Sequence, residues 1–185
     1  ISFPLAAPSA NLATKVSPTR TEDLSEEIKK NTLLIKSKKS KYGLESTVIK
    51  VEKNKIYILR MGSITVEELK KDFPKYNIIS NSLENNLSPG NQKRHYSPNL
   101  PIRINIKSVK KEEGLLNFGK NKLKSSICEF NLSIKSDLNE AANNFYHFLN
   151  LLDKSNCKKI AVAPIPNNGI GKTINDRLKR AIADD

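Results

Sequence analysis

The sequence predicts an α/β fold in two parts that are joined by a long polar segment. Short runs rich in β-branched and aromatic residues alternate with segments of helical period, which favours helices packed on sheets. In residues 80–101 this periodicity vanishes, and Asn, Ser, Pro and Gly dominate. We therefore expect an α/β unit in residues 1–80, a linker in residues 81–100 and a smaller α/β unit in residues 101–185.

The helices and strands of the first part follow from its caps and alternating runs. Thr21 is placed to cap a helix whose first turn is acidic, and Thr65 to cap a helix that ends before Pro74. The polar turn EKNK between two alternating runs predicts a hairpin. The expected order is a helix over 21–30, two or three strands from the short apolar run 33–35 and the runs 44–51 and 55–60, a helix over 65–73 and a strand over 76–79.

The second part alternates strands and helices, which predicts a Rossmann-like domain with a partly parallel sheet. The expected order is strands over 102–106 and 126–132, a helix over 137–152, a buried strand over 159–165 and a helix over 172–183. The last two elements are joined by PNNGIGKT, which ends like a phosphate-binding P-loop. Its first glycine is replaced by Pro166, which has no amide to donate to a phosphate. We therefore interpret the segment as a strand-to-helix turn containing Gly169 and Gly171.

The composition excludes several classes of protein. No apolar run approaches the roughly 20 residues that span a bilayer, and the first residues lack a signal-peptide pattern, so we expect a cytoplasmic protein without membrane contact. The net charge of +13 suggests RNA as a partner, although an excess of Lys, Asn and Ile also follows from an AT-rich genome. Only six of the 32 cationic residues are arginines, which makes each arginine a candidate for bidentate binding.

The sequence shows no catalytic or metal-binding cluster. Cys128 and Cys157 form no CxxC pair and have no histidine nearby, so we expect buried free thiols. His147 lies in an expected amphipathic helix and is interpreted as a packing or surface residue. The adjacent glutamates of each early helix point to different faces and form no carboxylate dyad. We therefore assign no catalytic residue and no metal ligand.

Residues 4–19, PLAAPSANLATKVSPT, combine prolines with short hydrogen-bonding side chains. Ser9, Asn11 and Thr19 are among the groups that could hold a polyanion or an amino acid, and the alanines leave room for a ligand near the backbone. A Pro/Ser-rich surface turn before a helix is the alternative interpretation.

The linker also carries reactive groups. Arg94, His95 and Tyr96 place a charge, a titratable ring and an aromatic hydroxyl side by side. Its length exceeds the usual connection of about 4–6 residues, and such long loops are either functional or disordered. We expect these three side chains to fold onto a ligand.

The order of these patches resembles that of one protein family. PLAAPSAN, SPT, GLESTVI, LRMGSIT and SPGNQKRHYSP follow one another as in the long, two-domain form of the YrdC-like threonylcarbamoyl-AMP synthases, and PIPNNGIGKTINDRLKRA resembles that form's C-terminal end. The resemblance covers nearly the whole chain. It implies that residues 1–80 are the C-terminal half of a YrdC-like twisted α/β catalytic domain. Because the family's N-terminal half has no counterpart here, we expect an N-terminally truncated chain that is inactive by itself.

The resemblance also implies a reaction. L-threonine, bicarbonate and ATP would give threonylcarbamoyl-AMP and pyrophosphate, and the adenylate would be the donor for threonylcarbamoyladenosine in tRNAs that read codons beginning with A. Mg²⁺ would accompany ATP, bound mainly by phosphates and water. The implied partner is the threonylcarbamoyl transferase machinery that modifies tRNA, with tRNA or double-stranded RNA as further candidates. A non-catalytic RNA-binding module that uses the basic surface of the same fold is the alternative.

By the same resemblance, six residues bind substrates and catalysis rests on positioning and electrostatics. The threonine contacts would be Ser9 and Ser46. The ATP contacts, of which the last would close over the nucleotide from the linker, would be Asn11, Thr19, Arg60 and Tyr96.

Four departures from the family pattern affect the loops. Ala13-Thr14 replaces a Ser-Gly pair, and Met61 replaces the proline of an Arg-Pro-Gly turn. SKKSKY stands where a glycine pair precedes ESTV, and Lys50 stands where an acidic residue is common. Because the side chains assigned to the ligands are all present, we expect these departures to alter loop conformation more than ligand identity.

Overall fold

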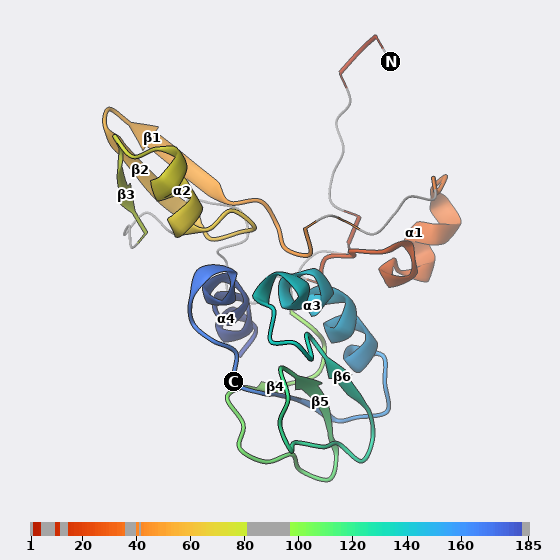
Figure 1. The fold of residues 1–185 in the computed structure, drawn as a ribbon. Helices are drawn as coiled ribbons and strands as arrows, with labels where there is room; N and C mark the ends of the chain where they lie inside the picture. The colour runs from red at the N-terminus through yellow and green to blue at the C-terminus, as the bar shows by residue number, and fades with distance from the viewer. Residues whose placement is uncertain are drawn as a thin grey trace.

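The computed structural model describes residues 2–4, 10–11, 15–35, 40, 42–80 and 97–182. It contains two sheets and four α-helices in this part of the chain, which confirms the α/β fold class (Figure 1). Ser9, Tyr96 and residues 81–96 of the expected linker lie outside the described residues. In the described ranges, no helix has the length and apolar content that a bilayer span needs.

The first sheet is a hairpin extended by one parallel strand. β1 (Val48–Glu52) and β2 (Lys55–Arg60) are antiparallel and joined by a tight turn, as the EKNK pattern predicts. The turn residue Lys53 has a φ of 51°, in the left-handed region that tight hairpin turns use. β3 (Asn77–Ile79) follows α2 (Val66–Asp72) and pairs in parallel with β2.

Helix α2 begins where its sequence predicts. Thr65 Oγ1 accepts a hydrogen bond from Glu68 N at 3.2 Å, and Glu68 Oε2 accepts one from Thr65 N at 2.7 Å. This reciprocal capping box satisfies two amides at the start of the helix. The hydrogen bonds from Thr65 also hold the pKa of the Glu68 carboxyl below its usual value.

The expected helix over 21–30 is divided in the structure. A 3₁₀ turn, η1 (Thr21–Asp23), precedes α1 (Glu26–Asn31), and α1 is capped by Ser25 instead of Thr21. The cause is the Asp23 carboxylate. Its Oδ2 accepts hydrogen bonds from the amides of residues 19 and 20, each at 3.0 Å, and these bonds fold the chain into a tight turn before the helix starts.

The expected strand over 33–35 is not formed. Leu33 and Ile35 are 92% and 86% exposed. Among the described residues, neither sheet includes this run, so its backbone has no ladder to complete. The apolar side chains alone do not make it a strand.

The second sheet is parallel throughout, in agreement with the expected Rossmann-like second part. Its strand order is β4-β7-β5-β6, and each neighbouring pair is parallel. Three strands lie within the ranges that the sequence predicts but are shorter: β4 (Ile102–Arg103), β6 (Glu129–Asn131) and β7 (Lys159–Val162).

The inner strand β5 (Glu113–Asn117) was not expected from the sequence, because polar residues begin and end it. All five of its residues are nevertheless buried. Arg103 donates hydrogen bonds of 2.9 and 2.7 Å to the two carboxylate oxygens of Glu113. A Cβ at Gly114 would lie 2.9 Å from Cys157 Sγ, so the strand packs too closely for a larger residue. Both cysteines are free thiols, as expected, but only Cys157 is buried, whereas Cys128 is half-buried.

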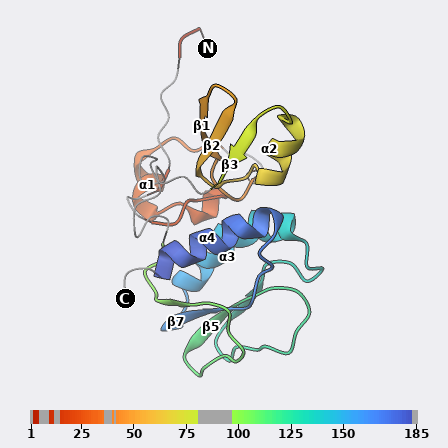
Figure 2. The ribbon, with the colours of Figure 1, turned by 90° about the vertical axis from the view of Figure 1, so that its left-hand side faces the viewer.

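Helices α3 (Leu138–Asp153) and α4 (Gly169–Ile182) lie side by side between the two sheets (Figures 1 and 2). Asp137 caps α3, because its Oδ1 accepts hydrogen bonds from Asn139 N at 2.7 Å and from Glu140 N at 3.0 Å. α4 begins three residues earlier than expected. Gly169 and Gly171 therefore belong to its first turn and not to a turn that precedes it.

The main apolar core lies where α3 and α4 pack on the second sheet. Phe145, Leu149 and Ile160 are among its fully buried residues. Val16 and Leu44 come from the first part of the chain and belong to the same core. The loops that carry the predicted binding residues are thus anchored on the second part.

Candidate functional site

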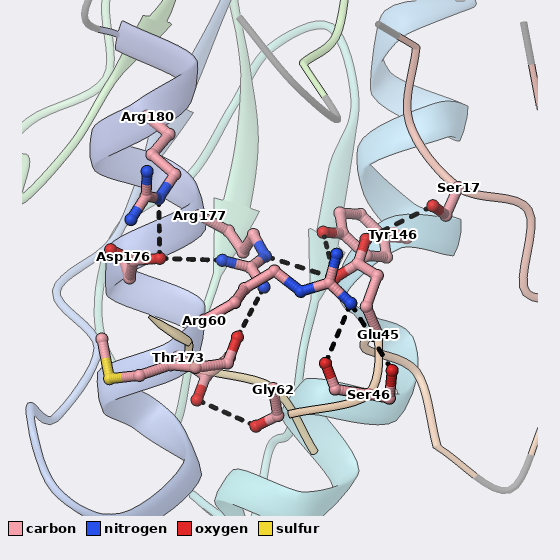
Figure 3. Close-up of polar contacts among 11 residues, drawn as sticks. Ser17, Glu45, Ser46, Arg60, Gly62, Tyr146, Thr173, Asp176, Arg177 and Arg180 are labelled. Carbon is pink, nitrogen blue, oxygen red and sulfur yellow. Dashed lines mark hydrogen bonds and ion pairs between the residues drawn. The ribbon is translucent and has the colours of Figure 1, made fainter. Parts of the chain in front are cut away.

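Ser46 and Arg60, predicted to bind different substrates, lie together in the structure. Arg60 Nη2 donates hydrogen bonds to Ser46 O at 3.0 Å and to Ser46 Oγ at 3.5 Å (Figure 3). The β1–β2 pairing explains this proximity, because Val48 and Arg60 are opposite each other in the hairpin. The hairpin therefore brings the ESTV and LRMGSIT patches to one place.

The turn after Arg60 is bound to the ESTV segment along its length. Ser63 N donates to Glu45 O at 2.9 Å. Thr47 Oγ1 donates to Ile64 O at 2.6 Å and accepts from Ile64 N at 3.0 Å. These hydrogen bonds fix the two segments on either side of Ser46.

Gly62 is needed for this close approach. A Cβ at this position would lie 2.3 Å from Thr47 N, 2.4 Å from Ser46 C and 2.5 Å from Glu45 O. All three are backbone atoms and cannot turn away. Only glycine therefore allows the two segments to pack as they do.

The loop that carries Thr19 is held by two charged groups. Thr19 Oγ1 donates to Asp23 Oδ2 at 3.1 Å, and Ser17 Oγ donates to Glu45 Oε1 at 3.3 Å. Asp23 Oδ1 in turn lies 2.6 Å from His147 Nδ1, with both side chains buried. The packing interpretation of His147 is confirmed, and the residue links α3 to the loop.

Asn11 lies at a different point of the same loop. Its Nδ2 donates to Lys15 O at 3.0 Å, and it lines a cavity of about 210 Å³ between the loop, α1 and α3. Lys15 forms a parallel β-bridge with Ser97, the residue after Tyr96. The end of the expected linker therefore meets the N-terminal loop, although no described contact joins Asn11 or Thr19 directly to Arg60.

Helix α4 contacts both segments beside Ser46 and Arg60. Arg177 Nε donates to Glu45 Oε2 at 3.2 Å, and Arg177 Nη2 donates to Met61 O at 2.6 Å (Figure 3). Thr173 Oγ1 donates to Gly62 O at 3.1 Å. The name Arg177 cluster is used below for the residues joined by these contacts: Glu45, Met61, Gly62, Tyr146, Thr173, Asp176 and Arg177.

The remaining contacts of the Arg177 cluster balance its buried charge. Tyr146 OH donates to Glu45 Oε2 at 3.0 Å, and Arg177 Nη1 donates to Asp176 Oδ2 at 2.8 Å. Burial opposes the charged guanidinium, but Tyr146, Glu45 and Asp176 outweigh that effect and raise the pKa of Arg177. Arg177 is therefore cationic at neutral pH, as arginine side chains are.

Two weak signals in the sequence point to this cluster, and neither identifies the partners of Arg177. One is the scarcity of arginine in a lysine-rich chain. The other is the Gly-Lys-Thr of PNNGIGKT, which engages the first part of the chain: Thr173 bonds to Gly62, and Lys172 Nζ lies 2.7 Å from Glu67 Oε1. That hydrogen bond from Lys172 lowers the pKa of the Glu67 carboxyl.

The arrangement can position substrates but supplies no obvious nucleophile or proton-transfer pair. In the part of the chain that the structure describes, no three His, Cys, Asp or Glu side chains are grouped as a metal site. Its polar groups are hydroxyls, backbone carbonyls, the carboxylate of Glu45 and the guanidinium groups of Arg60 and Arg177. Such a set suits the alignment of anionic reactants.

Two family models match this chain. Residues 64–183 match the model described as the C-terminal domain of threonylcarbamoyl-AMP synthase, and residues 1–62 match one described as telomere recombination. The first match alone covers more than half of the chain. The chain belongs to the threonylcarbamoyl-AMP synthase family, which confirms the resemblance seen in its sequence motifs.

Curated relatives match along almost the whole chain. The threonylcarbamoyl-AMP synthase of Pyrococcus abyssi (strain GE5 / Orsay) is 27% identical over 200 residues, and that of Bacillus subtilis (strain 168) is 26% identical over 197. The matches cover 96% and 97% of this chain and 57% of each relative. The chain thus spans a little more than half the length of these relatives.

Two solved structures share the fold. The crystal structure of P. abyssi Sua5 complexed with L-threonine has a TM-score of 0.73 at 23% identity, covering 95% of this chain and 57% of that chain. The structure of a P. abyssi Sua5 variant with one histidine and one tyrosine changed to alanine has a TM-score of 0.72 at 21% identity, covering 95% and 56%.

Proposed function

We propose that the full-length protein makes threonylcarbamoyl-AMP from L-threonine, bicarbonate and ATP and releases pyrophosphate. The observation that carries this proposal is the hydrogen bonding of Arg60 to Ser46, because one residue is assigned to ATP and the other to threonine. Membership of the synthase family supports the same reaction. The threonine in the P. abyssi Sua5 complex supports threonine as a substrate.

Two groups of residues would hold the substrates. Ser46, with Ser9, would bind threonine through hydroxyl hydrogen bonds. Arg60 would place its guanidinium on the ATP phosphates, where a planar fork can bind two oxygens. The remaining ATP contacts, taken from the motifs, would be Asn11, Thr19 and Tyr96.

The chemistry requires two bond exchanges. The threonine amine forms a bond with the carbon of bicarbonate and water leaves, which gives a carbamate. A carbamate oxygen then bonds to the α-phosphorus of ATP as the bond from that phosphorus to the β-phosphate oxygen breaks, and pyrophosphate leaves with its electron pair. Arg60, beside Ser46, is placed to stabilise the charge that the two anions share.

Mg²⁺ would enter with ATP, held by phosphates and water, and would neutralise phosphate charge. The product would pass to the threonylcarbamoyl transferase machinery for tRNA modification in the cytoplasm. Its mixed anhydride between carbamate and phosphate makes it a suitable acyl donor to a tRNA base.

Pyrophosphate release by the full-length protein tests the proposal. We expect release only when threonine, bicarbonate and ATP are all present, with threonylcarbamoyl-AMP detected by mass spectrometry. Release that continues without threonine or without bicarbonate would exclude the proposed reaction.

RNA binding without catalysis is tested by a salt titration. A steep loss of RNA affinity with salt, independent of threonine, would favour that function. Among the described cations, Arg103 is paired with Glu113 and Lys158 with Glu112.

A further inference from the structure

Arg177 connects the two segments that carry Ser46 and Arg60. Its Nε binds the side chain of Glu45, the residue before Ser46, and its Nη2 binds the carbonyl of Met61, the residue after Arg60. The side chain of Arg177 is 2% exposed, so these bonds face little competition from water. A single guanidinium therefore holds both sides of the site from a helix of the second part.

Further contacts from α3 and α4 reinforce the connection that Arg177 makes between the two segments. Tyr146 from α3 binds the same Glu45 oxygen, and Thr173, one turn before Arg177, binds Gly62 O. Gly43 lies on α3 so closely that a Cβ would be 2.1 Å from Ala142 O. The chain is thus held against α3 at Gly43 and against both α3 and α4 at Glu45.

We propose that Arg177 is a positioning residue of the synthase site: from α4 it sets the separation between Ser46 and Arg60 by holding Glu45 and Met61 together. This inference rests on the substrate roles proposed for Ser46 and Arg60. Arg177 does not touch substrate and acts only through the two segments. The second part of the chain would then be needed for substrate binding.

A lysine cannot replace this arginine fully. The guanidinium binds Glu45, Met61 and Asp176 through three different nitrogens in one plane. An ammonium is a point charge on a flexible stem and cannot reach these acceptors in the same directions. Arg177→Lys therefore preserves charge but releases at least one segment, whereas Arg177→Met also removes the charge.

Steady-state kinetics of the full-length protein test the proposal. We expect Arg177→Lys to lower kcat/KM for threonine and for ATP by about 10- to 100-fold, chiefly through higher KM, because small displacements of binding groups are costly. Arg177→Met should lose more. A purely structural role would reduce the amount of folded enzyme, which lowers apparent kcat and leaves KM unchanged.

Arg180→Lys is the matched control. Arg180 lies on the same helix and its Nε donates to Asp176 at 2.9 Å, but it has no described contact with Glu45 or Met61. We expect wild-type KM values from this variant. Wild-type KM values in both Arg177→Lys and Arg177→Met would overturn the proposal.

A double variant keeps the test decisive if Arg177→Met fails to fold. Glu45→Gln retains the shape of the acceptor and removes its charge. Glu45→Gln combined with Arg177→Lys should be no worse than the more impaired single variant, because both changes release the same contact. Losses that multiply would show that the two residues act independently and would overturn the proposal.

Hydrogen exchange gives a readout that does not depend on the reaction. The amide of Ser63 donates to Glu45 O, and we expect Arg177→Lys to accelerate its exchange while that of Leu69 within α2 is unchanged. Equal exchange at Ser63 in wild type and variant would contradict the positioning role. Absence of synthase activity in the wild type would instead contradict the proposed function and leave this comparison intact.

Discussion

At the scale of residues, the site depends on the shapes of an arginine and a glycine. Arg60 reaches both the carbonyl and the hydroxyl of Ser46, and Gly62 lets the following turn lie against the backbone of Glu45 and Thr47. Neither residue can be exchanged for one of similar charge or size without moving a neighbour.

The first prediction concerns Arg60→Lys in the full-length protein. We expect kcat/KM for ATP to fall by about tenfold or more, because an ammonium replaces a fork that makes charge-assisted hydrogen bonds. Pyrophosphate release at varied ATP concentration measures the effect, with Arg180→Lys as the matched control. Unchanged ATP kinetics would remove Arg60 from the site.

The second prediction concerns Gly62→Ala. A methyl group there overlaps three backbone atoms, so we expect a loss of about 1–3 kcal/mol in the free energy of unfolding together with a higher KM for threonine. Gly169→Ala is the comparison, because its Cβ would meet no atom within 4 Å, although its φ of 45° carries a cost of about 1 kcal/mol. Urea unfolding and kinetics that do not distinguish the two variants would contradict the argument.

At the scale of elements, helix caps and the hairpin follow local signals. Thr65 begins α2 and Asp137 caps α3 because their side chains bond to amides two or three residues away. The hairpin likewise depends on a short turn. Elements that need distant partners, such as β5, were less well predicted.

The third prediction concerns the linker. Ser97 pairs with Lys15 of the N-terminal loop, and Tyr96 is the residue directly before Ser97 in the sequence. We expect Tyr96→Ala to lower kcat in the full-length protein and to leave the thermal unfolding temperature unchanged. A variant with wild-type turnover would show that the linker serves as a tether only.

At the scale of the whole molecule, hydrogen-bonded pairs of polar side chains join segments that are distant in sequence. Asp23 meets His147 and Glu45 meets Arg177 between the first and second parts. Within the second part, Arg103 lies against the buried Glu113. The hydrogen bond from Arg103 lowers the pKa of the Glu113 carboxyl from its ordinary value of 4.5, although burial opposes that effect.

The fourth prediction follows from the sign of that shift. A carboxyl whose pKa is lower in the folded state contributes stability that is present above the unfolded value of 4.5 and is lost as pH falls through the folded value below it. We expect Glu113→Gln to destabilise the protein at neutral pH and to reduce the loss of stability on acidification below 4.5. Urea unfolding across that range measures it, with the exposed Glu112→Gln as control. A pH dependence like that of the wild type would contradict the assignment.

The sequence by itself determined what depends on neighbouring residues and on the order of motifs. The cap at Thr65, the helix over residues 137–152, the strand β2 and the α/β class were all predicted, because each follows from contacts within a few residues or from periodicity. The same holds for the family motifs, which identified Ser46 and Arg60 before the hairpin showed them in contact.

Only the tertiary structure decided what depends on partners far along the chain. The division of the expected helix at 21–30 depends on Asp23, which is held by His147, 124 positions away. The buried carboxylate of Glu113 in β5 is bound by Arg103 of β4, ten positions away. Arg177 donates a hydrogen bond to Glu45, which lies 132 positions earlier in the sequence. The physical reason is the same in each case: a polar or charged side chain can be buried only where folding supplies its hydrogen-bond partner, and no local pattern records where that partner lies.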